Sequence, residues 1–281
     1  MYELIAENYR GEKLQLVPNA NYIVDLDGIT GVTAAINTSV TGNSAGSSFN
    51  SSRSEDREVS LSIMPRGDVE KNRIKLYRFF QSGKFTRLYY KNESRDVYID
   101  GYVKQAPDGS LFTSKETLDV NILCPKPYWK SKTSVITDIS DVIPRFTFPF
   151  AIDYDAPIPF SEIERGTEKT VVNNGDVESG IIIELRADGN VSNIVIYDEY
   201  GGSFKINYSM ISGDLITINT YRGEKSITLT RGGVETNMFK YVGDNPTWFN
   251  LLPGDNIFMI EATGSDLLQI KYINYNLYEG V

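Results

Sequence analysis

Short segments in which apolar and polar residues alternate make up most of this sequence, and this period of two residues constrains the fold more than any other feature. In the first half of the chain these segments are residues 21–28, 57–65, 84–91, 95–104 and 115–124. Such alternation is typical of β-strands with one face in a core and the other in solvent. We therefore predict a mainly β N-terminal domain, an antiparallel β-sandwich in which Asn92, Glu93 and Ser94 form a hairpin loop.

Residues 68–82 break this alternation and predict the one long helix of the chain. Asp68 is suited to cap its N-terminus and Gly83 to end it, because these residue types favour those positions. The predicted apolar face of the helix consists of Val69, Leu76, Tyr77 and Phe80.

The second half of the chain repeats the alternation in shorter segments. They are residues 168–174, 181–187, 191–198, 203–208, 214–220, 225–231, 256–262 and 267–275. Gly and Asn residues separate many of them, as in the turns of antiparallel sheets. The pattern predicts a second, all-β domain of the β-sandwich class.

A proline-rich tract lies between the two sets of strands, with four prolines between residues 144 and 159. Proline cannot donate a hydrogen bond to a sheet, so this density excludes central strands. We predict three parts: an N-terminal domain at 1–130, a connecting segment at 131–165 and a C-terminal sandwich at 166–281.

Residues 41–56 are polar, rich in Ser, Gly and Asn, and offer few side chains for burial. One interpretation is a surface loop or the tip of a long hairpin. The other is an arm that becomes ordered against a neighbouring subunit, because long excursions inside compact domains tend to be functional. The sequence leaves both interpretations open.

Composition excludes several classes of enzyme. The chain has 281 residues, no histidine, one cysteine and a formal net charge of -9. Without histidine there is no Ser-His-Asp relay and no H-E-x-x-H zinc site, and Cys124 alone cannot form an intramolecular disulfide. We expect a structural or binding protein without enzymatic activity or cofactor. The acidic balance also argues against a protein that grips nucleic acid through its phosphates.

Two acidic motifs are weak candidates for chemistry. Asp153, Asp155, Glu162 and Glu164 lie close in sequence, and glycoside hydrolysis uses a pair of carboxylates. No second feature distinguishes one pair, so solvated loop charge is the favoured interpretation. Residues 173–178 superficially resemble a calcium loop, but a β-turn is favoured because Asn-Gly is a strong turn signal.

Aromatic residues of the second half offer an alternative function. Tyr197, Tyr200 and Trp248 form a candidate sugar platform, since aromatic rings stack on pyranose rings. Packing within the sandwich is the simpler interpretation for most of these rings. The alternative to a structural role is a carbohydrate-binding adhesion module that recognises host cell-wall polysaccharide through the C-terminal sandwich.

No segment approaches the roughly 20 apolar residues of a membrane span, so we expect no membrane insertion. The first residues, MYELIAENYR, carry acidic side chains and no apolar core. We therefore expect no signal peptide at this position.

Residues 115–129, KETLDVNILCPKPYW, carry a more specific signal. A strand that ends in C-P-x-P-Y-W after an N-terminal β domain resembles the distal tail protein family of long-tailed phages. The resemblance extends to VVNNGDVESGIIIEL and SGDLITINTYRGEKSITL downstream, in the order of that family. We predict that the motif packs the junction between domains, with Cys124, Pro125, Pro127, Tyr128 and Trp129 as its members.

The resemblance implies a homohexameric ring at the virion tail tip. In that family the N-terminal domain builds the ring, and a galectin-like or carbohydrate-module-like sandwich follows it. The ring joins the tail tube protein to tail-tip, baseplate and receptor-binding proteins, and DNA crosses its lumen. Assembly in the host cytoplasm is implied as well.

Two hypotheses follow from that picture. The polar segment at 41–56 is a candidate ring-contact arm, with Asn43, Phe49 and Arg53 as its candidate contact residues. Part of the acidic charge lines the lumen, so that DNA slides past without being held.

Overall fold

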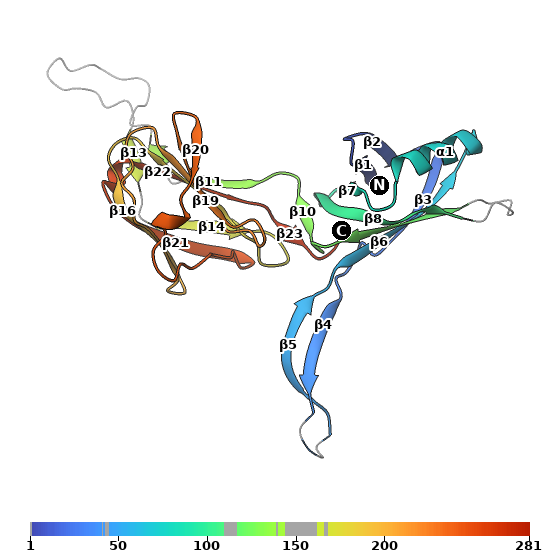
Figure 1. Cartoon of the computed structure of the whole chain (residues 1–281), viewed down its shortest axis with the longest axis horizontal. Helices are drawn as coiled ribbons and strands as arrows, with labels where there is room; N and C mark the ends of the chain where they lie inside the picture. Colours follow the sequence, from blue (N-terminus) through green and yellow to red (C-terminus); the bar gives the residue numbers. More distant parts are fainter. Residues whose placement is uncertain are drawn as a thin grey trace, which may run out of the picture. The chain divides into compact units, whose positions relative to one another are not determined.

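The computed structural model describes residues 2–40, 42, 45–109, 117–138, 140–143, 162–165 and 168–281, with only the backbone described at 140–143 and 162–165. The chain forms two compact units (Figure 1). The N-terminal unit comprises Met1–Lys132 and Leu277–Val281, and the C-terminal unit comprises Thr133–Asn276. The predicted mainly β fold class is confirmed.

One antiparallel sheet, rather than the two separate sheets of a sandwich, forms the body of the N-terminal unit. Its strands are β1 (Glu3–Asn8), β2 (Lys13–Val17), β3 (Tyr22–Asp27), β6 (Arg57–Pro65), β7 (Phe85–Lys91), β8 (Asp96–Asp108), β9 (Leu118–Cys124), β10 (Trp129–Ser131) and β23 (Leu277–Tyr278). The main order is β2-β1-β7-β8-β9-β6-β3, and β10 pairs with β8 and β23. Because β2 and β3 also contact each other, the sheet nearly closes on itself.

The alternation read from the sequence follows from this sheet. In β6 every second side chain, including Val59, Leu61 and Ile63, is buried, and the residues between them face outward. Leu118, Val120 and Ile122 of β9 continue the same inner face, which holds the core of the unit.

The predicted helix is confirmed as α1 (Val69–Phe79), and the Asp68 side chain accepts a hydrogen bond from the Lys71 N–H at 3.2 Å. Its buried face differs from the prediction. Leu76, Phe79 and Phe80 are buried, whereas Val69 and Tyr77 are 38% and 41% exposed. The buried residues of the helix lie at its C-terminal end, whereas most of the residues before Leu76 are exposed. No helix in the described ranges is long and apolar enough to cross a membrane.

A separate hairpin runs away from the sheet (Figure 1). It consists of β4 (Ala34–Ser39) and β5 (Ser48–Ser54), which pair with each other and with no other described strand. Every residue of β5 and most of β4 are exposed. The hairpin therefore begins before the polar segment at 41–56 and includes part of it as a strand. We call residues 34–54 the arm.

Two antiparallel sheets form the C-terminal unit. The six-stranded sheet has the order β11-β22-β15-β18-β19-β20, and the four-stranded sheet has the order β14-β21-β16-β17. Their strands are β11 (Val135–Asp138), β14 (Glu168–Asn173), β15 (Ile182–Ala187), β16 (Ser192–Asp198), β17 (Ser203–Ile206), β18 (Leu215–Asn219), β19 (Ser226–Arg231), β20 (Val234–Asn237), β21 (Gly254–Thr263) and β22 (Leu268–Asn274). The backbones of β12 (Ser140–Ile143) and β13 (Glu162–Arg165) pair separately, and η1 (Phe239–Tyr241) and η2 (Ser265–Leu267) are single turns.

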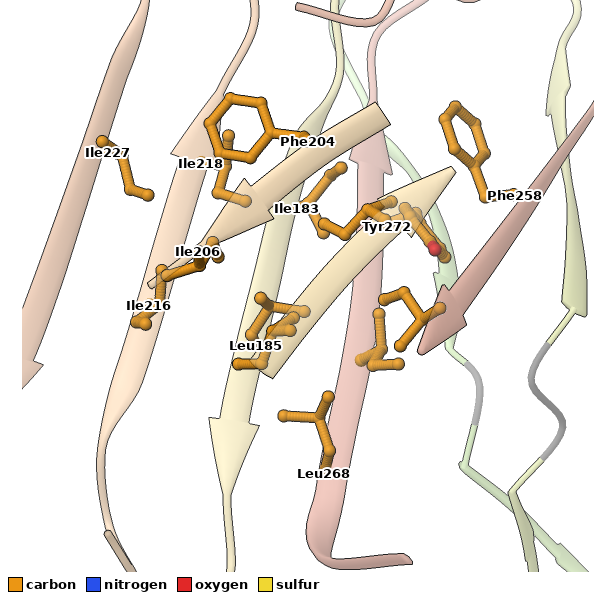
Figure 2. Packing of buried hydrophobic residues seen from close by; sticks show 14 of the residues in the cluster. Ile183, Leu185, Phe204, Ile206, Ile216, Ile218, Ile227, Phe258, Leu268 and Tyr272 are labelled. Carbon is orange, nitrogen blue, oxygen red and sulfur yellow. The ribbon is translucent and has the colours of Figure 1, made fainter. Parts of the chain in front are cut away.

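The core of the sandwich lies between these sheets (Figure 2). Ile183 and Leu185 of β15 point from the six-stranded sheet, and Phe204 of β17 points from the other. The rings of Phe258 and Tyr272, one from each sheet, stack with their centroids 5.3 Å apart. The β-sandwich predicted for the second half is confirmed.

The units differ from the predicted domain ranges at two places. Residues 135–138, assigned from the sequence to the connecting segment, form β11 beside β22. Residues 277–281, assigned to the C-terminal sandwich, return to the N-terminal unit, where β23 pairs with β10. Strands this short contain too few residues for a period of two to be recognised.

Candidate assembly interface

A buried arginine lies where distant stretches of the N-terminal unit meet. Arg57, the first residue of β6, is only 4% exposed. Its guanidinium donates through Nε to the Pro127 carbonyl at 2.6 Å and through Nη1 to the Gly28 carbonyl at 2.8 Å. Nη2 donates to the carbonyl of Glu279, near the C-terminus. Burial lowers the pKa of Arg57 from its ordinary value.

The last two residues of the C-P-K-P-Y-W motif contact the end of the arm and the segment that precedes it. Trp129 is fully buried, and its Nε1–H donates to the Ile29 carbonyl at 3.2 Å. Its ring lies 6.2 Å from that of Tyr90, measured between centroids. The Tyr128 hydroxyl is 2.6 Å from Oγ of Ser54, the last residue of β5.

These contacts hold the chain where it enters and leaves the arm. We call residues 28–33 and 55–57 the arm roots; they are joined by a hydrogen bond of 2.8 Å from the Glu55 N–H to the Thr33 carbonyl. We call the side chains and carbonyls that hold the roots the arm-root clamp. Its members are Arg57, Pro127, Tyr128, Trp129 and Glu279.

Two glycines allow the close approach of these segments. Gly28 has a φ of +77°, and a Cβ there would collide with the Glu58 carbonyl. A Cβ at Gly280 would collide with the carbonyl of Thr30 in the first root. A side chain at either position would push apart segments that the clamp holds together.

The remaining motif residues surround this clamp. Cys124 is buried at the end of β9, and burial raises the pKa of its thiol to about 12. A Cβ at Gly101 would come within 2.8 Å of its Sγ, so the neighbouring strand lies tightly against it. Pro125 is exposed directly after β9, and Pro127 contributes its carbonyl to the clamp. Cys124 is thus a packed residue without the features of a reactive thiol.

The arm carries apolar side chains in solvent. Ile36 and Phe49 are 64% and 65% exposed, and Arg53 is exposed as well. Asn43, the third candidate contact residue, lies outside the described residues. No described residue of the two arm strands is buried, and polar contacts such as the 3.1 Å bond from Asn37 Nδ2 to Ser51 Oγ reinforce their pairing. Isolated two-stranded hairpins of this kind are marginally stable in water.

The middle of the outward face of β3, β6 and β9 is acidic and polar, between the exposed Ile23 at one end and the ion pair of Glu58 with Lys104 at the other. In register, Asp25 lies opposite Ser62, and Ser62 lies opposite Asp119 on the next strand. The Ser62 hydroxyl donates to Asp119 Oδ1 at 2.6 Å. We call this surface the acidic outer face; its residues are Asp25, Asp27, Ser60, Ser62, Asp119 and Asn121.

The three candidate sugar-platform residues have different surroundings. The Tyr197 hydroxyl donates to Glu261 Oε2 at 3.3 Å, whereas Tyr200 is 69% exposed in the turn after β16. The ring of Trp248 packs against other aromatic residues. Its neighbours are Phe204 at 5.2 Å and Phe239 at 5.8 Å, measured between ring centroids. No ring contact among the described residues joins Tyr197, Tyr200 and Trp248 into one surface.

The structure describes only part of the two acidic motifs. Asp153 and Asp155 lie outside the described residues, and only the backbone is described at Glu162 and Glu164. In the loop after β14, Asn173 Oδ1 accepts the Gly175 N–H at 2.9 Å, as in an Asx-turn. Among the described residues, no group of three His, Cys, Asp or Glu side chains is placed to hold a metal ion.

A shallow groove of about 340 Å³ crosses the outer face of the six-stranded sheet. Charged and polar side chains line it, including Glu184, Arg186, Thr230, Gln269 and Lys271. The Lys271 ammonium and the Glu184 carboxylate are 4.0 Å apart. None of the lining residues is aromatic, so this groove does not provide the stacking surface that the sugar platform requires.

Comparison with known proteins agrees with the resemblance carried by the C-P-K-P-Y-W motif. Residues 174–275 match the family model described as siphovirus-type tail component, C-terminal domain. No curated protein sequence matches the chain.

Solved structures show a similar fold over the whole chain. The crystal structure of the phage SPP1 Dit protein matches with a TM-score of 0.70 and 12% identity, covering 98% of each chain. That protein is described as a paradigm of the hub adsorption apparatus in phages that infect Gram-positive bacteria. A chain of the phage P2 baseplate in its activated conformation with Ca matches with a TM-score of 0.51 and 11% identity, covering 100% of each chain.

Proposed function

We propose that this chain is the structural hub of a phage tail tip, because residues 174–275 match the family model described as siphovirus-type tail component, C-terminal domain. Six copies form a ring from their N-terminal units, and the ring joins the tail tube to the tail-tip, baseplate and receptor-binding proteins. DNA crosses the lumen of the ring. The protein works at the virion tail tip, after assembly in the host cytoplasm.

The arm is the observation that carries this proposal. A hairpin without a core exposes Ile36 and Phe49, and burial of an apolar side chain is what most stabilises a contact between subunits. A ring of identical subunits needs two different surfaces on each copy, one donating and one receiving. A hairpin that leaves the body of its own unit is suited to the donating role.

Deletion of residues 42–54 is expected to weaken ring assembly, since it removes β5 and with it the pairing of the arm. The point variant Phe49→Ser is expected to raise the chain concentration at half-assembly about tenfold or more, because burial of a Phe side chain contributes about 1.5–3 kcal/mol. Light scattering across a concentration series measures this shift.

The matched control is Val234→Ser on β20, where the apolar side chain is 66% exposed, almost the same as the 65% of Phe49. It is expected to leave the mass profile unchanged. A hexamer mass that neither the deletion nor Phe49→Ser alters would count against the arm as a ring contact.

The acidic outer face is proposed as the lumen wall. Its charged residues are carboxylates, which repel the phosphates of DNA, and the cation at its end, Lys104, is paired with Glu58 at 2.8 Å. Its serines and Asn121 bond to the neighbouring strands, as Ser60 Oγ does to Asn121 Oδ1 at 2.9 Å. A wall of this kind lets DNA pass without holding it.

Reversal of charge on this face is expected to make the ring retain DNA. The double variant Asp25→Lys/Asp119→Lys adds cations to the proposed wall, and retention of linear duplex DNA is expected at ~50 mM salt and is lost by ~200 mM. The control, Glu235→Lys/Asp266→Lys, makes the same charge change in the C-terminal unit. Equal retention by both variants, or by neither, would contradict the proposed position of the face.

A further inference from the structure

Both roots of the arm are held by the two stretches of chain that lead to and from the C-terminal unit. The outgoing stretch supplies Pro127 and Trp129, which contact the two roots, and Tyr128, which contacts the last residue of the arm. The returning stretch supplies the Glu279 carbonyl to Arg57, and Gly280 lies against Thr30. The arm is thus anchored on the two connections between the units rather than on the sheet alone.

The two connections are themselves tied together. Trp129 of β10 pairs with Tyr278 of β23, and Lys130 pairs with Leu277. The guanidinium of Arg95 lies over the ring of Tyr278, with its Cζ 4.1 Å from the ring centroid. The outgoing and returning stretches therefore act as a two-stranded strap within the N-terminal unit.

Arg57 joins this strap to the arm. Its planar fork donates to Gly28 in the first root, to Pro127 in the outgoing stretch and to Glu279 in the returning stretch. A buried guanidinium that loses one of these acceptors keeps an unsatisfied donor, which costs more than the lost bond itself. The three hydrogen bonds of Arg57 therefore stabilise the unit as a set, and the loss of any one of them destabilises it by more than the energy of that bond.

We propose that the arm-root clamp couples the direction of the arm to the strap, with Arg57 as the positioning residue. A displacement of either connection breaks the set of contacts at Arg57 and releases the arm roots. The effect of the coupling on assembly rests on the proposed function, because it requires the arm to be a ring contact. The coupling itself is a property of a single chain.

Spin labels measure the direction of the arm directly. Ser51→Cys in the arm and Glu93→Cys in the loop between β7 and β8 place the labels at two exposed positions. Native Cys124 is buried, with a thiol pKa raised to about 12, so it stays unlabelled. Dipolar EPR on labelled chains diluted with unlabelled chains gives the distance distribution within one chain.

The parent chain is expected to give a narrow distribution of the distance between the labels at positions 51 and 93. Deletion of residues 277–281, which removes β23 and the Glu279 acceptor, is expected to broaden it at least twofold. Arg57→Met is expected to do the same. Tyr128→Phe removes only the hydroxyl that contacts Ser54, and a smaller broadening is expected from a chain that keeps its core intact.

The control is Arg87→Met, because Arg87 is an arginine of the same unit that pairs with Asp100 and not with the clamp. It is expected to keep the parent width. The coupling is overturned if the distance distributions of the deletion variant and of Tyr128→Phe are both as narrow as that of the parent. It is also overturned if Arg87→Met broadens the distribution as much as the clamp variants do.

Separate outcomes identify a failure of the proposed function. If the clamp variants broaden the distribution but the parent never forms a ring in light scattering, the coupling stands and the hub proposal fails. If the parent forms a ring and the widths do not change, the hub proposal stands and the coupling fails.

Discussion

Replacement of Trp129 by alanine is expected to lower the free energy of unfolding of the N-terminal unit by about 3–5 kcal/mol. The side chain is fully buried and packs against Tyr90, so alanine leaves a cavity in a core that the short β10 strand closes. The lost Nε1–H also leaves the Ile29 carbonyl without its donor.

Calorimetry and fluorescence separate the two units in this experiment. The chain has two tryptophans, so in Trp129→Ala the fluorescence comes from Trp248 of the C-terminal unit alone. The calorimetric transition of the N-terminal unit is expected to move to a lower temperature while the Trp248 signal keeps its midpoint. Trp129→Phe, which refills most of the cavity, is expected to recover part of the loss. A Trp129→Ala chain with unchanged unfolding would show that the motif does not stabilise the unit.

Asp214→Asn is expected to destabilise the C-terminal unit by about 2–3 kcal/mol at neutral pH. The Asp214 side chain is fully buried, and its two oxygens accept Nε and Nη2 of Arg231, each at 2.6 Å. Its Oδ2 also accepts the Ile211 N–H at 2.9 Å. Asparagine keeps the shape of the side chain but removes the charge and one of the accepting oxygens.

The pH dependence gives this prediction its sign. The hydrogen bonds from Arg231, followed by that from the Ile211 N–H, lower the pKa of Asp214 below its ordinary value of 3.8. A carboxyl whose pKa is lowered by folding contributes stability that is fully present above its unfolded-state pKa. That contribution is lost as the pH falls below 3.8 and through the lower folded-state value. The difference between parent and Asp214→Asn is therefore expected to shrink in acid.

Denaturant unfolding at neutral and acidic pH measures that difference. Asp266→Asn, an exposed carboxylate in η2, is the control and is expected to change little at either pH. A difference between parent and Asp214→Asn that stays constant down to acidic pH would mean that the charge of Asp214 contributes nothing.

The strands that the sequence predicts correctly are those with one buried and one exposed face. Val59, Leu61 and Ile63 of β6 mark such a strand, and observed bounds 57–65 agree with the predicted ones. The arm strands have no buried face, so β4 and β5 show no alternation of apolar residues. Their pairing follows from backbone hydrogen bonds that any polar sequence can make.

The helix illustrates a different limit. Its spacing correctly predicts that Leu76 and Phe80 are buried, but Phe79 is buried as well and Val69 is not. A helical period defines which residues share a face, whereas the length of the contact with the sheet decides how many of them are covered.

The clamp was only half visible in the sequence. The motif ending in Trp129 was predicted to pack a junction, and its contacts in the structure involve the arm roots. Arg57 lies outside the motif. It falls on the same face of its strand as buried Val59, and the alternation therefore indicates a buried guanidinium. Its acceptor Glu279 lies 222 residues away along the chain, a pairing that no local pattern reveals.

The strap formed by β10 and β23 has a topological consequence. The C-terminal unit is inserted into the N-terminal unit, because Lys132 precedes it and Leu277 follows it. Its own first and last sandwich strands also pair, with Val135 opposite Asn274, so the two ends of the insert meet. A domain whose two ends lie close together can be replaced by another, because the N-terminal unit then only has to span the same short distance between Lys132 and Leu277. Replacement of this inserted unit would leave the arm and its clamp unchanged, because both lie in the N-terminal unit.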